Sequence, residues 1–166
     1  MNLKSGIFLA AIVLLALVLI SCTNPFAPKL GESGSSSVPQ AGTVGGMLEL
    51  FKYAYNTKDS LVYSQLLDSA FVFQYYDAEH SIYDQWYRTT DLKATGGLFR
   101  SFDVIDLSWY NLPESVWNYD LEDTPIQIIV NFNLTLDNTL VYGFARFDCY
   151  KKAGSKFKIT AWKDDF

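Results

Sequence analysis

The sequence predicts a single α+β domain over residues 43–166, preceded by an apolar N-terminal segment and a linker. Three observations carry this prediction. Apolar residues recur at helical spacing between residues 47 and 67, and an apolar residue stands at every second position from 126 to 136. Proline, glycine and serine crowd the stretch before residue 43. Helices in the first half of a domain and antiparallel strands in the second are typical of the α+β class.

Three helices are expected in the first half of the domain. The apolar side of the first consists of Met47, Leu50, Phe51 and Ala54. This helix breaks at residues 56–59, where Thr57 or Asp59 can cap a second, shorter helix that ends near residue 67. The third helix is predicted over residues 90–102, and its glycines at 96 and 97 each cost about 1 kcal/mol relative to alanine.

Strands are expected in the rest of the domain. They are predicted at residues 70–76, 103–110, 126–136, about 140–150 and 156–162, with a loop containing Pro113 and Pro125 before the longest. One face of the strand after residue 139 carries Leu140, Tyr142, Phe144, Arg146, Asp148 and Tyr150, and the opposite face carries Val141, Gly143, Ala145, Phe147 and Cys149. One face should cover the helices, and the other is left for a second subunit or for the chain's own ends.

The N-terminal segment has the composition of a secretory signal. Lys4 precedes an apolar run at residues 6–20, which is shorter than the roughly 20 residues of a spanning helix. The run closes with LISC at residues 19–22, which resembles the lipobox of bacterial lipoproteins. That resemblance implies that residues 1–21 are removed and that Cys22 is lipidated. The competing interpretation is a single transmembrane anchor in which Cys22 is incidental.

The lipoprotein resemblance also implies a location. The chain would be anchored by lipid in a bacterial cell envelope, and Thr23 after the cysteine favours the outer membrane if there are two membranes. Residues 22–42 would then form a flexible tether, because this Pro/Gly/Ser-rich composition cannot bury enough surface to order itself. A chain of this kind reaches roughly 25 Å.

Charge and cysteine content exclude several classes of function. Loss of Lys4 with residues 1–21 would leave 12 basic and 18 acidic residues, a net charge of −6 against −5 for the whole chain. Nucleic-acid binding needs a basic face, so no nucleic-acid partner is expected. One histidine and one cysteine besides Cys22 fall short of a zinc ligand set, and we expect neither metal nor cofactor. Cys149 is expected to be a buried, inert thiol.

The order of these elements resembles the nuclear transport factor 2-like superfamily, which includes ketosteroid isomerase, scytalone dehydratase and polyketide cyclases. The stretches that carry the resemblance are FKYAYNTKD at 51–59, LLDSAFVF at 66–73, GFAR at 143–146 and GSKFKITAWKD at 154–164. They span essentially the whole domain, and they are diffuse. The resemblance implies three N-terminal helices packed on a strongly curved, mostly antiparallel sheet, with an apolar pocket at the open end of the resulting cone.

Nine side chains are candidates for lining that pocket. Alternation along the strand after residue 139 assigns Tyr142, Phe144, Arg146 and Asp148 to the inward face, and the resemblance implies Tyr55, Phe73, Tyr75, Trp86 and Tyr110. A buried arginine needs a partner. Arg146 either pairs with Asp148 as a structural ion pair or binds an anionic ligand through its fork of donors.

These residues favour a non-catalytic function over an enzyme. The pocket would bind a small apolar or anionic ligand, or the domain would dock a partner protein; a homodimer through the outer sheet face is a further possibility. Isomerases and hydro-lyases of this fold need a carboxylate base or a His–Asp pair. The single histidine, His80, lies in an acidic loop and is expected to be a solvated surface group. The alternatives are a small isomerase or hydro-lyase that uses the pocket, and a structural lipoprotein whose aromatic side chains fill it.

Overall fold

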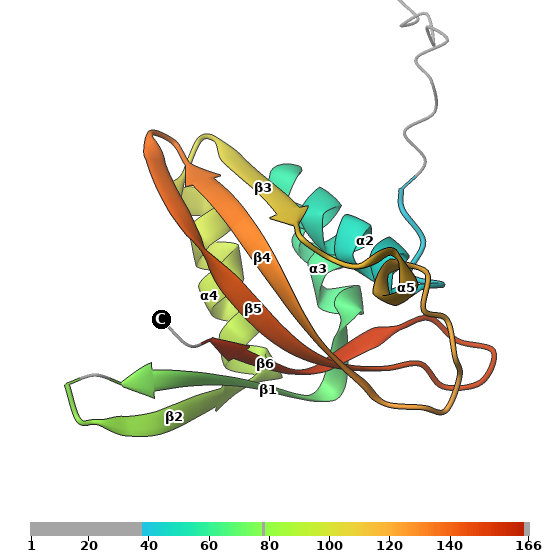
Figure 1. Ribbon diagram of the computed structural model, residues 1–166. Helices are drawn as coiled ribbons and strands as arrows, with labels where there is room; N and C mark the ends of the chain where they lie inside the picture. Colours follow the sequence, from blue (N-terminus) through green and yellow to red (C-terminus); the bar gives the residue numbers. More distant parts are fainter. Residues whose placement is uncertain (1–37, 78, 165–166) are drawn as a thin grey trace, which may run out of the picture. The chain divides into compact units, whose positions relative to one another are not determined.

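The computed structural model describes residues 38–77 and 79–164. The predicted signal peptide, Cys22 and most of the predicted tether therefore lie outside the described residues. The elements in chain order are α2 (Val44–Asn56), α3 (Ser60–Leu66), β1 (Leu67–Asp77), β2 (Ile82–Tyr87), α4 (Arg88–Ser101), β3 (Ile105–Tyr110), α5 (Glu114–Trp117), β4 (Ile126–Leu136), β5 (Thr139–Tyr150) and β6 (Lys158–Asp164) (Figure 1).

Six strands form one mixed sheet in the order β2-β1-β6-β5-β4-β3. All neighbouring pairs are antiparallel except β1 and β6, which run parallel. The sheet is strongly twisted, so that β1, β2 and β6 cross the direction of β3 and β4 at a large angle (Figure 1). Helices α2, α3 and α4 lie on one side of it, and none of the described helices covers the opposite side (Figure 1).

The predicted elements agree with this order, with three corrections. Strand β2 was not predicted, because five of its six side chains are exposed and no apolar face marks residues 82–87 as a strand. The third predicted helix, at residues 90–102, is confirmed as α4, but only α2 and α3 precede the first strand, so the grouping of three N-terminal helices that the resemblance implied does not form. The predicted loop after Pro113 contains a further short helix, α5. Trp117, the last residue of α5, packs its indole over Gly45 of α2, where an added Cβ would lie 2.5 Å from the ring. This contact holds α5 against α2.

Side-chain caps set where the first two helices begin. The hydroxyl of Thr43 accepts a hydrogen bond from the backbone N–H of Gly46 at 3.0 Å. Asp59 accepts from the N–H groups of Leu61 and Val62 at 3.0 and 2.9 Å. Of the two predicted candidates, Asp59 is therefore the one that caps α3. Thr57 instead donates to the carbonyl of Tyr53 at the end of α2. Each cap satisfies donors that the helix itself leaves unpaired.

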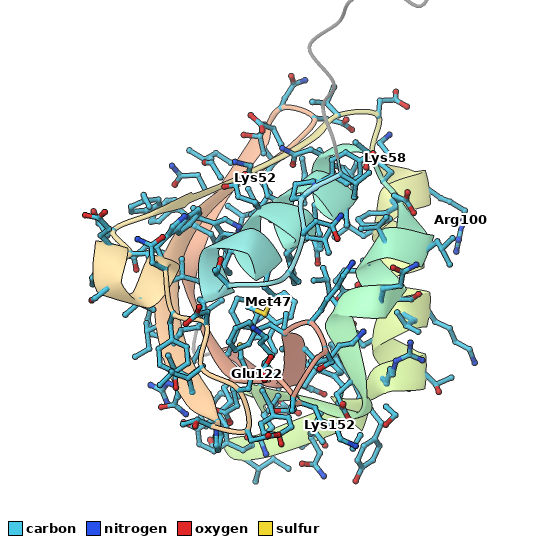
Figure 2. The ribbon with its side chains drawn as sticks, turned by 90° about the vertical axis from the view of Figure 1, so that its right-hand side faces the viewer. Met47, Lys52, Lys58, Arg100, Glu122 and Lys152 are labelled. Atoms are coloured by element: carbon cyan, nitrogen blue, oxygen red, sulfur yellow. The ribbon has the colours of Figure 1, made fainter. Side chains whose placement is uncertain are left out.

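The core lies between α2 and the sheet and is built mainly of aromatic rings. Phe51 is 1 % exposed and contacts five other rings, with centroids 4.8–5.7 Å away: Tyr55, Tyr63, Trp109, Phe147 and Trp162. Figure 2 shows Met47 beneath α2, also fully buried. The core also includes Ala41, which precedes α2 and whose carbonyl accepts a hydrogen bond from the N–H of Phe157.

Asn56, the last residue of α2, ties that helix to strand β3. Its Oδ1 accepts from the N–H of Leu107 at 2.7 Å, and its Nδ2 donates to the carbonyl of Leu107 at 3.4 Å. Because β3 is an edge strand, this side chain supplies partners that a neighbouring strand would otherwise supply.

Replacement of Asn56 by alanine should therefore destabilise the domain. The variant leaves the Leu107 backbone groups without a protein partner, and we expect the free energy of unfolding to fall by about 1–3 kcal/mol. Urea denaturation followed by circular dichroism measures this change. Asn133→Ala, at an exposed position of β4, is the matched control and should change stability by less than about 0.5 kcal/mol. Equal stability of the two variants would contradict the proposed tie.

Candidate functional site

An apolar cavity of about 160 Å³ lies between the helices and the sheet. Its lining comes from α2, α4 and strands β3 to β6, and consists of Phe51, Tyr55, Leu98, Leu107, Trp109, Phe132, Leu134, Val141, Ala145 and Trp162. An apolar cavity of about 150 Å³ in another protein stays dry and binds benzene. This cavity is therefore large enough for one six-membered ring.

A second cavity, also of about 160 Å³, adjoins the first. The two share Tyr55, Leu98 and Trp162 as lining residues, so the cavities meet at these side chains. The second cavity adds Phe73, Trp86, Asp91, Ala94 and Thr95. Ala94 is exposed, so the lining of this cavity reaches the protein surface at α4.

Asp91 is the polar centre of the second cavity. It lies in the first turn of α4 and is only 3 % exposed. Its Oδ2 accepts a hydrogen bond from the hydroxyl of Tyr63 at 2.7 Å, and its Oδ1 accepts one from the indole Nε1–H of Trp86 at 3.2 Å. The carboxyl group is thus held in one orientation by side chains from α3 and β2.

Burial determines the ionisation of Asp91 and Tyr63. Desolvation raises the pKa of the Asp91 carboxyl, and the hydrogen bonds from Tyr63 and Trp86 lower it in part. The pKa of Tyr63 lies well above its usual range, mainly because the phenol is buried and secondly because Tyr55 and Asp91 are close. Tyr63 therefore stays a neutral hydrogen-bond donor.

The burial of Asp91 could have been predicted from the helical spacing of the residues around it. Positions 91, 95, 98 and 102 follow helical spacing, so Asp91 and Thr95 lie on the same stripe as the apolar residues Leu98 and Phe102. An acidic residue on the buried stripe of a helix marks a functional candidate. None of these four positions is among the nine predicted pocket residues.

Three of the predicted pocket residues do line a cavity. Tyr55 borders both cavities, and Phe73 and Trp86 border the second. Tyr75 lies behind them, half-buried, with its ring centroid 5.1 Å from that of Trp86 and its hydroxyl donating to Asp84. Tyr110, at the end of β3, is 39 % exposed on the opposite side of the sheet.

The predicted inward face of β5 is wrong. Tyr142 and Phe144 are 73 % and 37 % exposed, and Arg146 and Asp148 share their outward face. The opposite face carries Ala145, Phe147 and Cys149, which are at most 1 % exposed. Both faces of this strand are largely apolar, so alternation alone could not decide between them. The compact Ala145 and Cys149, with the ring of Phe147, fit against the helices.

This outward orientation removes the premise of both interpretations of Arg146, which assumed an arginine inside the cone. Arg146 instead borders a surface hollow with Gln74, Tyr83 and Lys163. Asp148 accepts a hydrogen bond from Gln127 at 2.6 Å and lies 3.6 Å from the Lys163 ammonium. An anionic ligand in the cone therefore has no support, since the polar group that the cavity contains is a carboxyl.

The outer face of the sheet exposes several large apolar side chains. They include Tyr83, Tyr110, Ile129, Leu140, Tyr142 and Phe144. Their exposure is a condition that a homodimer through this face requires. Dimer formation itself remains a prediction.

His80 and Cys149 are where the sequence suggested. His80 is 70 % exposed in the β1–β2 turn, and its Nδ1 lies 2.7 Å from Oδ2 of Asp77, whose pKa this hydrogen bond lowers. Cys149 is buried, and burial raises the pKa of its thiol far above the usual range, which keeps it unreactive. In the described part of the chain, no group of three potential metal ligands comes together.

Comparisons with known proteins identify the fold. No protein-family model and no curated protein matches the sequence. Among solved structures, a protein named Rd1NTF2_04 with long sheet is 12 % identical, with a TM-score of 0.52 over 73 % of this chain and 98 % of its own. The fold is nuclear transport factor 2-like.

Two further solved structures are similar to this chain to a comparable extent. A conserved protein from Planctomyces limnophilus is 11 % identical with a TM-score of 0.55, over 72 % of this chain and 89 % of its own. The Kfla4162 protein from Kribbella flavida is 11 % identical with a TM-score of 0.53, over 72 % and 85 %. At these identities the similarity concerns the fold alone.

The raised pKa of Asp91 makes the stability of the domain depend on pH. The folded protein holds this proton more tightly than the unfolded chain does, so stability should fall as pH rises from about 3.9 through the folded pKa. Asp91→Asn cannot titrate and should lack this decrease. Urea denaturation between pH 4 and 7 measures the difference between the two proteins.

Asp103→Asn, which removes an exposed carboxylate, is the control for that comparison. The stability of Asp103→Asn should depend on pH as that of wild type does, because this variant retains Asp91. If Asp91→Asn lost stability with pH as steeply as this control, the carboxyl would not have a raised pKa.

Proposed function

We propose that this domain is a non-catalytic binding protein for a small apolar ligand that contains a single ring. The observation that supports this most is the pair of adjoining cavities of about 160 Å³ each, with aromatic walls and one carboxyl group. Ligand sites of proteins are typically mostly apolar cavities with a few placed polar groups. The described domain has that combination between its helices and its sheet.

A second candidate is a small isomerase or hydro-lyase. It is favoured by the position of Asp91, a buried carboxyl that borders the same cavity as Tyr55. A carboxylate base and a tyrosine donor are what proton-transfer chemistry requires. Binding is the better supported function, because the lining of the two cavities is mostly apolar and contains no histidine, and His80 lies 70 % exposed in the β1–β2 turn.

We also propose that the chain is a lipoprotein held in a bacterial cell envelope by lipid on Cys22. The proposal is supported by Lys4, the apolar run at residues 6–20, LISC at residues 19–22 and the Pro/Gly/Ser-rich stretch that follows. None of the described helices is both long and apolar enough to cross a membrane. A diacylated cysteine would supply the two chains that stable anchoring usually takes.

Filling the cavities should abolish ligand binding. Leu98 lines both cavities, so Leu98→Trp places an indole where the two cavities meet. We expect the wild-type domain to bind benzene or toluene and the variant to bind them at least tenfold more weakly. Calorimetric titration measures the affinity, and mass analysis of the recovered ligand reveals any product that the second candidate function would form.

Leu140→Trp is the matched control, because Leu140 is 59 % exposed on the outer face of the sheet. It should bind the same ligands with wild-type affinity. Thermal unfolding of both variants shows whether either is misfolded. Wild-type affinity of a folded Leu98→Trp variant would contradict ligand binding in these cavities.

The lipid anchor predicts a clear result for Cys22→Ala in the full chain. The variant should incorporate no labelled palmitate and should be released from membranes, whereas Cys149→Ala, which changes a buried thiol, should keep both properties. Labelling followed by membrane fractionation tests this. Membrane retention of Cys22→Ala with an uncleaved N-terminus would support the spanning helix instead.

A further inference from the structure

We infer that Asp91 and the aromatic walls around it form a site for an organic cation, namely an ammonium group attached to a single ring. The ammonium would lie beside Asp91 in the second cavity, and the ring would occupy the first. This inference rests on the proposed binding function and specifies the chemical class of its ligand.

The charge of Asp91 is the first step. Its two hydrogen-bond donors, the Tyr63 hydroxyl and the Trp86 indole, are both neutral. Among the described residues, no lysine, arginine or histidine forms an ion pair with Asp91. A buried carboxylate without a positive partner is energetically costly, and a ligand ammonium would supply that partner.

The carboxyl also has hydrogen-bonding capacity to spare. An ionised carboxylate offers about four lone-pair positions, and Asp91 uses one on each oxygen. The remaining positions can accept N–H donors from an ammonium group. Such charge-assisted hydrogen bonds are roughly twice as strong as those between neutral groups.

Aromatic rings surround the same space. Phe73 and Trp86 stack with their centroids 4.5 Å apart, and Trp162 meets Phe73 edge-on at 5.1 Å. Tyr55 completes the aromatic lining of this cavity. A cation within about 6 Å of an aromatic face is attracted by the ring quadrupole, most strongly by tryptophan.

The adjoining apolar cavity determines the other end of the ligand. Its lining contains no charged residue, and it meets the second cavity at Tyr55, Leu98 and Trp162. A ring with an amine one or two carbons away can therefore span the two. Benzylamine has this shape, and toluene has the same ring without the charge.

Titration of the purified domain with these two compounds tests the inference. We expect wild type to bind benzylamine at least tenfold more tightly than toluene. Asp91→Asn, which keeps the size of the side chain, should lose that preference while it retains toluene binding. Asp103→Asn, at an exposed position, should behave as wild type.

The outcomes separate this inference from the function on which it depends. Toluene binding without a preference for benzylamine would overturn the cation site and leave the apolar binding function standing. Binding of neither compound would overturn both. A preference for a ring with a carbonyl, such as benzaldehyde, over benzylamine would also overturn it, since Asp91 would then act as a protonated donor.

One measurement remains informative if Asp91→Asn does not fold. The Trp86 indole N–H donates to Asp91, so its proton resonance reports on that carboxylate. Benzylamine should shift this resonance in wild type at concentrations where toluene does not. An unchanged Trp86 resonance at saturating benzylamine would contradict the site.

Discussion

The packing of Phe51 against five aromatic rings is the contact on which the rest of the domain depends. Those rings come from α2, α3, β3, β5 and β6, so one side chain joins two helices to the edge strand β3 and to the centre of the twisted sheet. Aromatic rings are large and rigid, and they cannot close every gap that a curved sheet leaves around a helix. Phe51 itself borders the apolar cavity, which shows that core and cavity share their walls.

Asp91 introduces the one strongly polar element into this apolar interior. Apart from Thr95, it is the only polar residue that is fully buried in the described part of the chain. Tyr63 and Trp86 hold it in place, but both are neutral and neither removes the cost of a buried charge. Evolution commonly retains such groups for binding or chemistry rather than for stability, and the adjoining cavity gives this one something to bind.

Much of the architecture follows from local patterns. The period of two between residues 126 and 136 matches β4 residue for residue, and Asp59, one of the two predicted candidates, caps α3. The direction of Tyr55, Phe73 and Trp86 into the cone was also predictable, through the resemblance of the chain to a known fold. These features depend on a few neighbouring residues or on a whole topology.

The orientation of β5 depends neither on a few neighbouring residues nor on the topology, and the prediction of its inward face was wrong. Leu140, Tyr142 and Phe144 are more apolar than a solvent-exposed row usually is, whereas the buried row includes the small Gly143 and Ala145. Which row meets the helices is decided by volume across the sheet, and that is a property of the assembled core. Asp91 escaped notice for a related reason, since its burial requires Tyr63 and Trp86 from two other elements.

The parallel pairing of β1 with β6 has a consequence for how the chain is made. In the order β2-β1-β6-β5-β4-β3, the last strand is the bridge between an early hairpin and a later three-stranded segment. Until residues 158–164 have been synthesised, β1 of the hairpin and β5 of the three-stranded segment each lack the neighbouring strand that β6 supplies. Pairing across so many intervening residues is slow. The sheet of the described domain therefore becomes continuous only when β6, the last of its strands to be synthesised, takes its place between β1 and β5.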